Sequence, residues 1–246
     1  MIPLGIALQI YSLRTVYEEN PLLALRKVRE MGYSAVEFYG NHFKAEFYRG
    51  LLEESGLVPA GWHISIDELR NNFDEVVKKS LAIGNHTLCV PFFDAPCMDD
   101  WKRFADTLNS LAARLAPYGI RTGYHTHAHD HRELAPGVTP WDIVAENTEK
   151  AVILQLDLGN AASAGIDAFQ LLTKYERRSF CIHCKPYSGE KGFFTAIGED
   201  DIPWEKVLAF AREKGETKWL IVEYEEEDPL AVCHRSFAYL DKLQKN

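Results

Sequence analysis

The stretch GIALQIYSLRTVYEENPLLALRKVREMGYSAVEFYG, residues 5–40, decides the fold. An apolar run at 5–11 predicts a strand. Asn20-Pro21 predicts the N-cap and first position of a helix that ends at Gly32. A second apolar run at 35–38 predicts the next strand. A strand, a helix and a strand in this order are typical of a parallel βαβ unit.

The same unit recurs along the whole chain. The predicted strands lie at 5–11, 35–38, 59–64, 87–91, 120–126, 152–156, 180–184 and 219–222, with amphipathic segments between them. Eight parallel strands close a barrel whose interior side chains can fill. A doubly wound open sheet is the alternative, but the glycine-rich phosphate turn that it usually carries does not follow the first strand. We predict an α/β fold, a single (β/α)8 TIM barrel, as one domain spanning 1–246.

Composition narrows the functional classes. The chain has 246 residues, a net charge of −9 and five scattered cysteines. An acidic surface repels phosphate backbones, which argues against a nucleic-acid partner. An odd number of cysteines without framework spacing predicts free thiols in a reducing compartment. No leader pattern and no apolar run approaching the ~20 residues of a membrane span is found. We predict a cytoplasmic protein with no membrane partner, and a homo-oligomer stays open.

Four ionisable side chains end the fifth to eighth strands: His125, Asp157, His183 and Glu223. The active sites of parallel barrels lie at the C-terminal strand ends, and imidazoles and carboxylates from adjacent strands suit a transition metal. Singly, each has a plainer interpretation, since a strand-end Asp often caps a helix and a lone His is often only hydrogen-bonded. Together they predict one divalent ion, with Mn²⁺ placed ahead of Zn²⁺, Co²⁺ or Mg²⁺.

Other side chains at the same strand ends are candidates for substrate binding. Aromatic rings there can stack on a sugar ring, although rim aromatics also commonly serve only packing. Polar groups there can bind hydroxyls. The predicted substrate-binding residues are Tyr11, Glu37, Trp62, His63, Lys185 and Trp204.

The segment YHTHAHDH, residues 124–131, has two pairs of histidines. Alternate residues of a strand share a face, so His125 and His127 point the same way, and either can be a ligand or a base. We expect His129 and His131 in a solvated loop.

Two further motifs have structural interpretations. Cys181 and Cys184 lie three apart on a strand and face opposite sides, which is unsuitable for a shared metal or redox pair. The acidic run 225–228 predicts a solvated turn and helix cap.

Seven segments carry a resemblance to a known family. The chain resembles the xylose isomerase-like barrels described as sugar phosphate isomerases/epimerases, in the branch with a His-x-His segment. The segments are LQIYSLR (8–14), GYSAVEFYG (32–40), GYHTH (123–127), LQLDLGNAASAGID (154–167), CIHCK (181–185), AIGEDDIPW (196–204) and WLIVEYE (219–225).

This resemblance implies a ligand set. Family members hold a divalent metal at the ends of strands five to eight, and the best-known members use Glu, Asp, His and Glu. Asp157, His183 and Glu223 match the last three, and His125, which we prefer to His127, takes the first place. The sugar 3-epimerases use both glutamates as an acid–base pair, and this chain keeps only Glu223. It also has Asn160 where those epimerases often carry a histidine.

The predicted function is that of a metal-dependent sugar isomerase or epimerase acting on a sugar or polyol derivative. The metal would stabilise an enediolate, and Glu223, His125 or His127 would move the proton next to the carbonyl. A lyase or dehydratase of a keto-sugar or keto-inositol shares that first step and is the alternative. Endonuclease IV-like DNA repair is disfavoured by the acidic charge, and a non-catalytic sugar-binding barrel by the complete set of four ligands.

Overall fold

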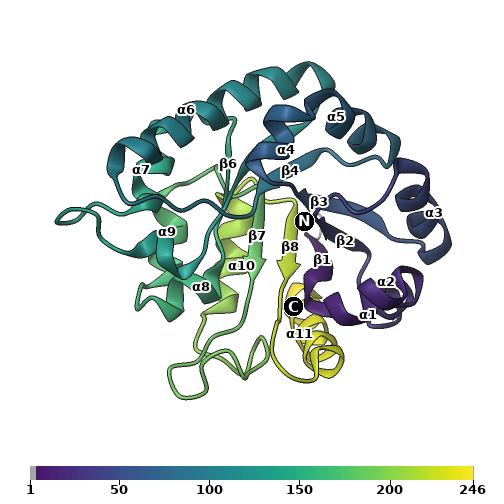
Figure 1. Cartoon of the computed structure of the whole chain (residues 1–246). Coiled ribbons are helices and arrows are strands. Elements are labelled where there is room, and N and C mark those ends of the chain that lie inside the picture. The colour runs from purple at the N-terminus through teal and green to yellow at the C-terminus, as the bar shows by residue number, and fades with distance from the viewer. Residues whose placement is uncertain (1–3, 246) are drawn as a thin grey trace.

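The computed structural model describes residues 4–245 and confirms the predicted (β/α)8 barrel. The parallel strands run in the order β6-β5-β4-β3-β2-β1-β8-β7. The backbone N–H of His183 donates to the carbonyl of Leu156 at 3.0 Å, which joins β7 to the end of β6 and completes the ring. Figure 1 shows the helices arranged around the strands. The strands are β1 (Gly5–Gln9), β2 (Ala35–Tyr39), β3 (Val58–His63), β4 (Thr87–Val90), β5 (Arg121–His125), β6 (Ile153–Gln155), β7 (Cys181–Cys184) and β8 (Trp219–Val222).

Helices follow the strands, as the periodicity predicts. The predicted Asn20 cap is present, since its side chain accepts the backbone N–H of Leu23 at 3.0 Å. The α-helices are α1 (Arg14–Glu19), α2 (Pro21–Glu30), α3 (Ala45–Ser55), α4 (Ile66–Asn71), α5 (Phe73–Ala82), α6 (Met98–Leu115), α7 (Pro140–Asn147), α8 (Leu158–Ser163), α9 (Ala168–Lys174), α10 (Trp204–Glu213) and α11 (Pro229–Lys245). The 3₁₀ helices are η1 (Ile10–Leu13), η2 (Ala116–Tyr118) and η3 (Ala128–His131). None of these helices combines the length and apolar character that crossing a bilayer requires.

The first strand is shorter than predicted. It ends at Gln9, and the chain turns into η1, where the Gln9 side chain accepts the backbone N–H of Tyr11 at 3.2 Å. Tyr11 therefore leaves the sheet at the mouth of the barrel and is 38% exposed.

Strand alternation separates two apolar layers. Outward-facing side chains pack against the helices in one large core. A smaller cluster of mostly small residues fills the barrel interior, namely Ala7, Ala35, Ala60, Cys89, Ile153, Cys181, Trp219 and Ile221. Cys181 belongs to this inner cluster and Cys184 to the outer core, on opposite faces as predicted, and both are free.

The interior changes from apolar to polar toward the C-terminal strand ends. Gln9 pairs in register with Glu37 across β1 and β2, and both side chains are buried. Gly61 on β3 faces Glu37 in register, and a Cβ there would lie 2.5 Å from Glu37 Oε1. Glycine therefore leaves room for a carboxylate inside the barrel.

Candidate active site

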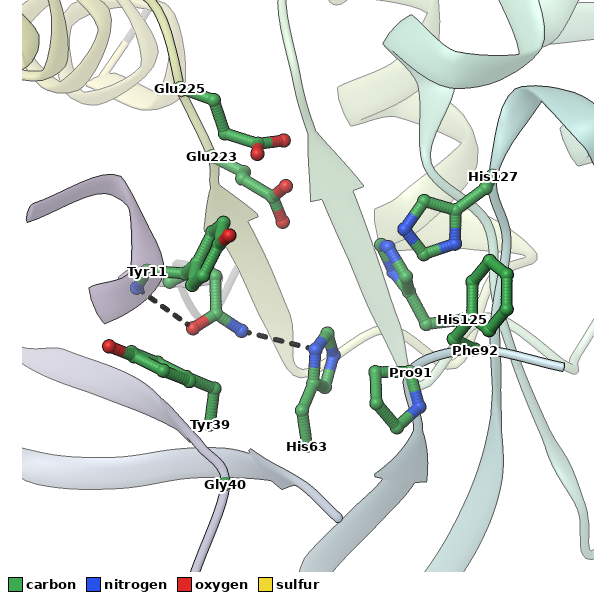
Figure 2. Close-up of a pocket in the computed structure, with 11 residues that line it drawn as sticks. Tyr11, Tyr39, Gly40, His63, Pro91, Phe92, His125, His127, Glu223 and Glu225 are labelled. Carbon is green, nitrogen blue, oxygen red and sulfur yellow. Dashed lines mark hydrogen bonds between the residues drawn. The ribbon is translucent and has the colours of Figure 1, made fainter. Parts of the chain in front are cut away.

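A cavity of about 320 Å³ opens at the C-terminal mouth of the barrel. Figure 2 shows Glu223 and Glu225 on one side of this cavity, and His125 and His127 lining another side. Its lining residues are Gln9, Tyr11, Tyr39, Gly40, His63, Pro91, Phe92, His125, His127, Glu223 and Glu225. The strand ends thus bring acid–base groups and aromatic rings to one cavity.

A hydrogen-bonded group that we call the Glu37 network (Gln9, Glu37, His63 and Gln155) supports this site. Glu37 is fully buried and accepts hydrogen bonds from Gln9 at 2.8 Å and from Gln155 at 2.9 Å. His63 Nε2 lies 3.1 Å from Glu37 and 2.8 Å from the side-chain oxygen of Gln155. Burial alone would raise the pKa of Glu37, but the imidazoles of His63 and His183 outweigh it and hold that pKa well below its usual range.

The four predicted metal ligands meet beside this network. One ligand atom each of His125, Asp157, His183 and Glu223, which we call the ligand cluster, lie within 4.8 Å of one another, and all four residues are buried. His183 Nδ1 lies 2.8 Å from Glu223 Oε2 and 3.9 Å from Asp157 Oδ2. The structure therefore brings together groups that the sequence holds far apart.

Several atoms of the ligand cluster lack hydrogen bonds. Asp157 Oδ1 caps α8 by accepting the backbone N–H of Asn160 at 2.7 Å, whereas Asp157 Oδ2 has no hydrogen-bond partner among residues 4–245. The same holds for the Nδ1 atoms of His125 and His183. A buried polar atom without a partner costs roughly 1–3 kcal/mol, so several that converge need an explanation. A divalent cation fits this donor set of two imidazoles and two carboxylates.

The orientation of His183 supports the same fit. Its Nε2 lies 2.7 Å from Glu37 Oε2, and a proton held in that hydrogen bond leaves the Nδ1 lone pair facing the cluster. Burial alone would lower the pKa of His183, but Glu37 and Glu223 outweigh it and hold that pKa well above its usual value. A cation at the cluster would take the place of the second proton.

Burial governs the other titrating groups of the site. It raises the pKa of Asp157 to about 7, with Lys185 opposing and Glu223 adding to the effect. It lowers the pKa of His127 to about 4, with Glu223 opposing, so that this imidazole is neutral at neutral pH. Burial also holds the pKa of His125 well below its usual value, together with His183 and His63.

Lys185 does not line the cavity, although it was predicted to bind substrate. It is buried, donates to Glu223 Oε1 at 3.2 Å, and forms a second ion pair with Glu225. Burial alone would lower the pKa of Lys185, but Glu223, Asp157 and Glu225 together raise it well above its usual range. Its charge is therefore committed to two carboxylates.

Three other predicted substrate contacts are corrected by their placement. Trp62 is fully buried, packs against Tyr48 of α3 with ring centroids 5.2 Å apart, and donates to the carbonyl of Gly40. Trp204 is also buried, and its indole donates to Asp200 at 2.7 Å. We assign packing roles to both, because their rings point into the outer layer and not into the cavity. Glu37 lies in the network and not on the cavity wall, whereas Tyr11 and His63 do line the cavity.

Sequence reasoning missed several residues. Glu225 was expected in a solvated turn, yet it lines the cavity and is half-buried, so that expectation is wrong. It lies beyond the end of β8, so strand alternation offered no signal for it. His131 was expected in solvent and is buried, while His129 is partly buried and contacts the Phe93 carbonyl at 2.9 Å. The other missed residues are Tyr39, Gly40, Pro91, Phe92 and Gln155.

The sequence is similar to those of known proteins, at low identity. The chain is 25% identical over 245 residues to the rhizopine catabolism protein MocC of Rhizobium meliloti, a match covering 82% of this chain and 74% of that protein. It is 25% identical over 169 residues to inosose dehydratase of Salmonella typhimurium (strain LT2), covering 60% and 55%. This second match spans little more than half of the dehydratase.

Solved structures share the fold. A sugar phosphate isomerase/epimerase from Parabacteroides distasonis superposes with a TM-score of 0.80 at 20% identity, covering 97% of this chain and 94% of that one. The IOLI protein, crystallised with a binding zinc atom, superposes with a TM-score of 0.69 at 14% identity, covering 97% and 96%. The family model of the xylose isomerase-like TIM barrel matches residues 25–243. The chain belongs to the xylose isomerase-like TIM barrel family.

Proposed function

We propose that this protein is a metal-dependent enzyme that moves a proton next to a carbonyl group of a sugar or polyol, as an isomerase or epimerase does. One observation carries the proposal: the unpaired donor atoms of the ligand cluster converge beside a cavity lined by acid–base side chains. Membership in the xylose isomerase-like family supports it.

His125, Asp157, His183 and Glu223 would hold the ion. An ion bound there supplies Lewis acidity, which stabilises negative charge on a substrate oxygen. We propose Mn²⁺ ahead of Zn²⁺, as expected from the sequence, while the zinc in the similar IOLI structure makes zinc the first rival. Metal analysis of protein grown with each ion distinguishes them.

The chain's own residues then divide the remaining work. Tyr11, Tyr39 and Phe92 offer rings to the apolar faces of a substrate. The carboxylates of β8 line the cavity on one side and the neutral imidazole of His127 on another (Figure 2). A base must be deprotonated before it can take a proton. Burial alone would raise the pKa of Glu223, but Lys185 and His183 outweigh it and hold that pKa well below its usual value.

The cavity favours an uncharged substrate. Neither Lys nor Arg is among its lining residues within 4–245, and the nearby Lys185 is already paired with two carboxylates. A phosphate group would therefore meet carboxylates without a free cation, which opposes binding. An unphosphorylated polyol or keto-polyol is the substrate class we propose.

A dehydratase is the second candidate. The position on β5 that carries one of the paired glutamates in the sugar 3-epimerases is His125 here. Elimination of water needs one base beside the carbonyl and an acid for the departing hydroxyl, which a carboxylate and an imidazole can supply. The match to inosose dehydratase favours this candidate on sequence grounds.

One experiment tests the function. Purified protein is analysed for bound metal and then incubated in D₂O with D-fructose and with 2-keto-myo-inositol, and the products are followed by NMR and mass spectrometry. Deuterium uptake on carbon without loss of water indicates isomerisation or epimerisation, and loss of water indicates dehydration. Protein that holds no stoichiometric metal and exchanges no hydrogen contradicts the proposal.

The remaining predictions concern the surroundings of the protein. A cytoplasmic location stays a prediction, as does the absence of a nucleic-acid partner, which the net charge of −9 supports. Tight, salt-sensitive binding to duplex DNA in a gel-shift titration would contradict the second.

A further inference from the structure

We propose that Glu225, and not the predicted metal ligand Glu223, is the catalytic carboxylate that takes the proton from substrate. The inference rests on the proposed function. It starts from the way the two β8 carboxylates share Lys185 at the cavity wall.

Both oxygens of Glu223 are already engaged. Glu223 Oε2 lies 2.8 Å from His183 Nδ1, inside the ligand cluster. Glu223 Oε1 accepts a hydrogen bond from Lys185 Nζ at 3.2 Å. Each oxygen of Glu223 therefore already has a close polar neighbour, His183 in the ligand cluster on one side and Lys185 on the other, which makes Glu223 the less accessible carboxylate for a proton on substrate.

Glu225 has what Glu223 lacks. It lines the cavity, and Lys185 Nζ donates to its Oε1. Within residues 4–245, Lys185 is the side chain that donates a hydrogen bond to this carboxylate, and the Glu223 carboxylate lies next to it. A single anchored oxygen orients the carboxylate, and the other stays available to substrate. Arg14 further fixes the backbone here by donating to the Glu225 carbonyl at 3.2 Å.

Lys185 is held in place from a third direction. Its Nζ lies 5.3 Å from the centre of the Phe193 ring, in addition to its two carboxylate partners. The ammonium group thus joins the carboxylate on the metal side to the carboxylate on the cavity side. When Glu225 takes up a proton, the charge on Lys185 remains paired with Glu223.

The proton transfer balances without another reactant. Glu225 Oε2 takes the proton from the carbon next to the carbonyl, and an O–H bond forms as the C–H bond breaks. The freed electron pair becomes the carbon–carbon double bond of an enediolate, whose negative charge rests on oxygen. In isomerisation, the new carboxylic acid returns the proton to the neighbouring carbon, while the hydroxyl on the first carbon passes its proton to the former carbonyl oxygen and becomes the new carbonyl. In dehydration, the carboxylic acid gives its proton to the departing hydroxyl, which leaves as water as the enediolate re-forms the carbonyl.

The test compares three variants of the metal-loaded protein: Glu225→Gln, Glu223→Gln and the exposed control Glu227→Gln. The assay is hydrogen exchange of D-fructose or 2-keto-myo-inositol in D₂O, with metal affinity measured separately. Glu225→Gln is expected to lower kcat for exchange by about 10²–10⁴-fold and to keep wild-type metal affinity. Glu223→Gln is expected to weaken metal binding, and Glu227→Gln to change neither quantity.

Chemical rescue separates catalysis from structure. Glu225→Ala should regain exchange when formate or acetate is added, because a small carboxylate can occupy the vacated space, whereas a structural defect would not respond. Near-wild-type exchange in Glu225→Gln, or a loss of metal parallel to the loss of exchange, overturns the assignment to Glu225 alone. Wild-type protein that binds metal but exchanges no hydrogen on either probe overturns the proposed function, and the role of Glu225 with it.

Discussion

The Glu37 network and the ligand cluster are neighbours made of the same kinds of side chain, yet they differ in hydrogen bonding. In the network, both oxygens of Glu37 accept hydrogen bonds, and His63 contacts Gln155. In the cluster, Asp157 Oδ2 and two imidazole nitrogens have no hydrogen-bond partner within residues 4–245. Buried polar groups whose hydrogen bonds are all made stabilise a fold. Buried polar atoms that lack hydrogen-bond partners and point toward one another indicate that a ligand completes the site.

His183 belongs to both regions. Its Nε2 bonds to Glu37 and its Nδ1 faces Asp157 and Glu223. Polar groups that bond to the far side of a ligand histidine fix its orientation and raise its basicity. The network therefore prepares the cluster, and each region can be perturbed separately.

Replacing His183 should give the largest effect, because this residue joins the two regions. His183→Ala removes one of the proposed metal ligands and leaves the buried Glu37 carboxylate without its partner at 2.7 Å. Metal affinity should fall by more than about 100-fold, beyond the loss expected for a supporting residue. The free energy of unfolding of the metal-free protein should fall by about 3–5 kcal/mol. Metal titration measures the affinity and urea unfolding measures the free energy of unfolding. His234→Ala, at an exposed position, is the control for both. Unchanged metal affinity in His183→Ala would mean that the ligand cluster does not bind the metal and is not functionally different from the Glu37 network.

Replacing Glu37 tests the network alone. Glu37→Gln keeps an oxygen that can accept from His183 but removes the charge. Metal affinity should fall by about 10–100-fold, although Glu37 is not among the proposed ligands. Isothermal titration measures it, and Glu46→Gln on the exposed surface of α3 is the control. Wild-type affinity in Glu37→Gln would show that the network serves the fold only.

The cavity wall should respond differently from both regions. Phe92 is 57% exposed, with its ring 5.6 Å from that of His127. Phe92→Ala removes an aromatic contact worth about 1.5 kcal/mol at most, so KM for exchange should rise by up to roughly tenfold while metal affinity stays constant. Steady-state kinetics measures KM, and Phe47→Ala on α3, which lies outside the cavity lining, is the control. A change in metal affinity would mean that the wall and the cluster are not independent.

A hydrogen-bonded carboxylate outside the mouth should give the smallest effect. Asp200 accepts hydrogen bonds from Trp204, Gly198 and Tyr187, yet burial raises its pKa to about 6. Its unfolded pKa is near 3.8, so between these values the folded state binds more protons than the unfolded state. The stability that Asp200 contributes therefore falls as pH rises through that window.

Asp200→Asn should remove this part of the pH dependence and leave metal affinity unchanged. Urea unfolding of wild type and variant across the window measures the difference in slope. Parallel curves would contradict a raised pKa in the folded protein.

Local patterns predicted the barrel because strand alternation and helix capping depend on near neighbours. The eight predicted strands match β1–β8 to within two residues, and Asn20 caps α2 as expected. Asp157 shows the limit of such reasoning. Its helix-capping and metal-binding interpretations were alternatives in the sequence. In the structure one oxygen caps α8, and the other has no hydrogen-bond partner within residues 4–245.

The placement of side chains around the mouth was less predictable. Trp62 and His63 are adjacent in sequence, and alternation sends the first toward α3 and the second into the cavity. Glu225 lies beyond the end of β8, where no strand period applies, so its approach to Lys185 depends on how the chain leaves the barrel.

The sequence alone determined the eight βα units, because strand and helix periodicity depends on residues close together in the chain. It also placed four ionisable residues at the ends of β5 to β8, because each directly follows or ends an apolar run. Only the tertiary structure decided which of their atoms lack hydrogen-bond partners within residues 4–245, and that Glu225 lines the cavity beside them. Those facts depend on distances of a few ångströms between strands far apart in the chain. Such distances are set by the closure of the barrel where β7 meets the end of β6 and β8 pairs with β1.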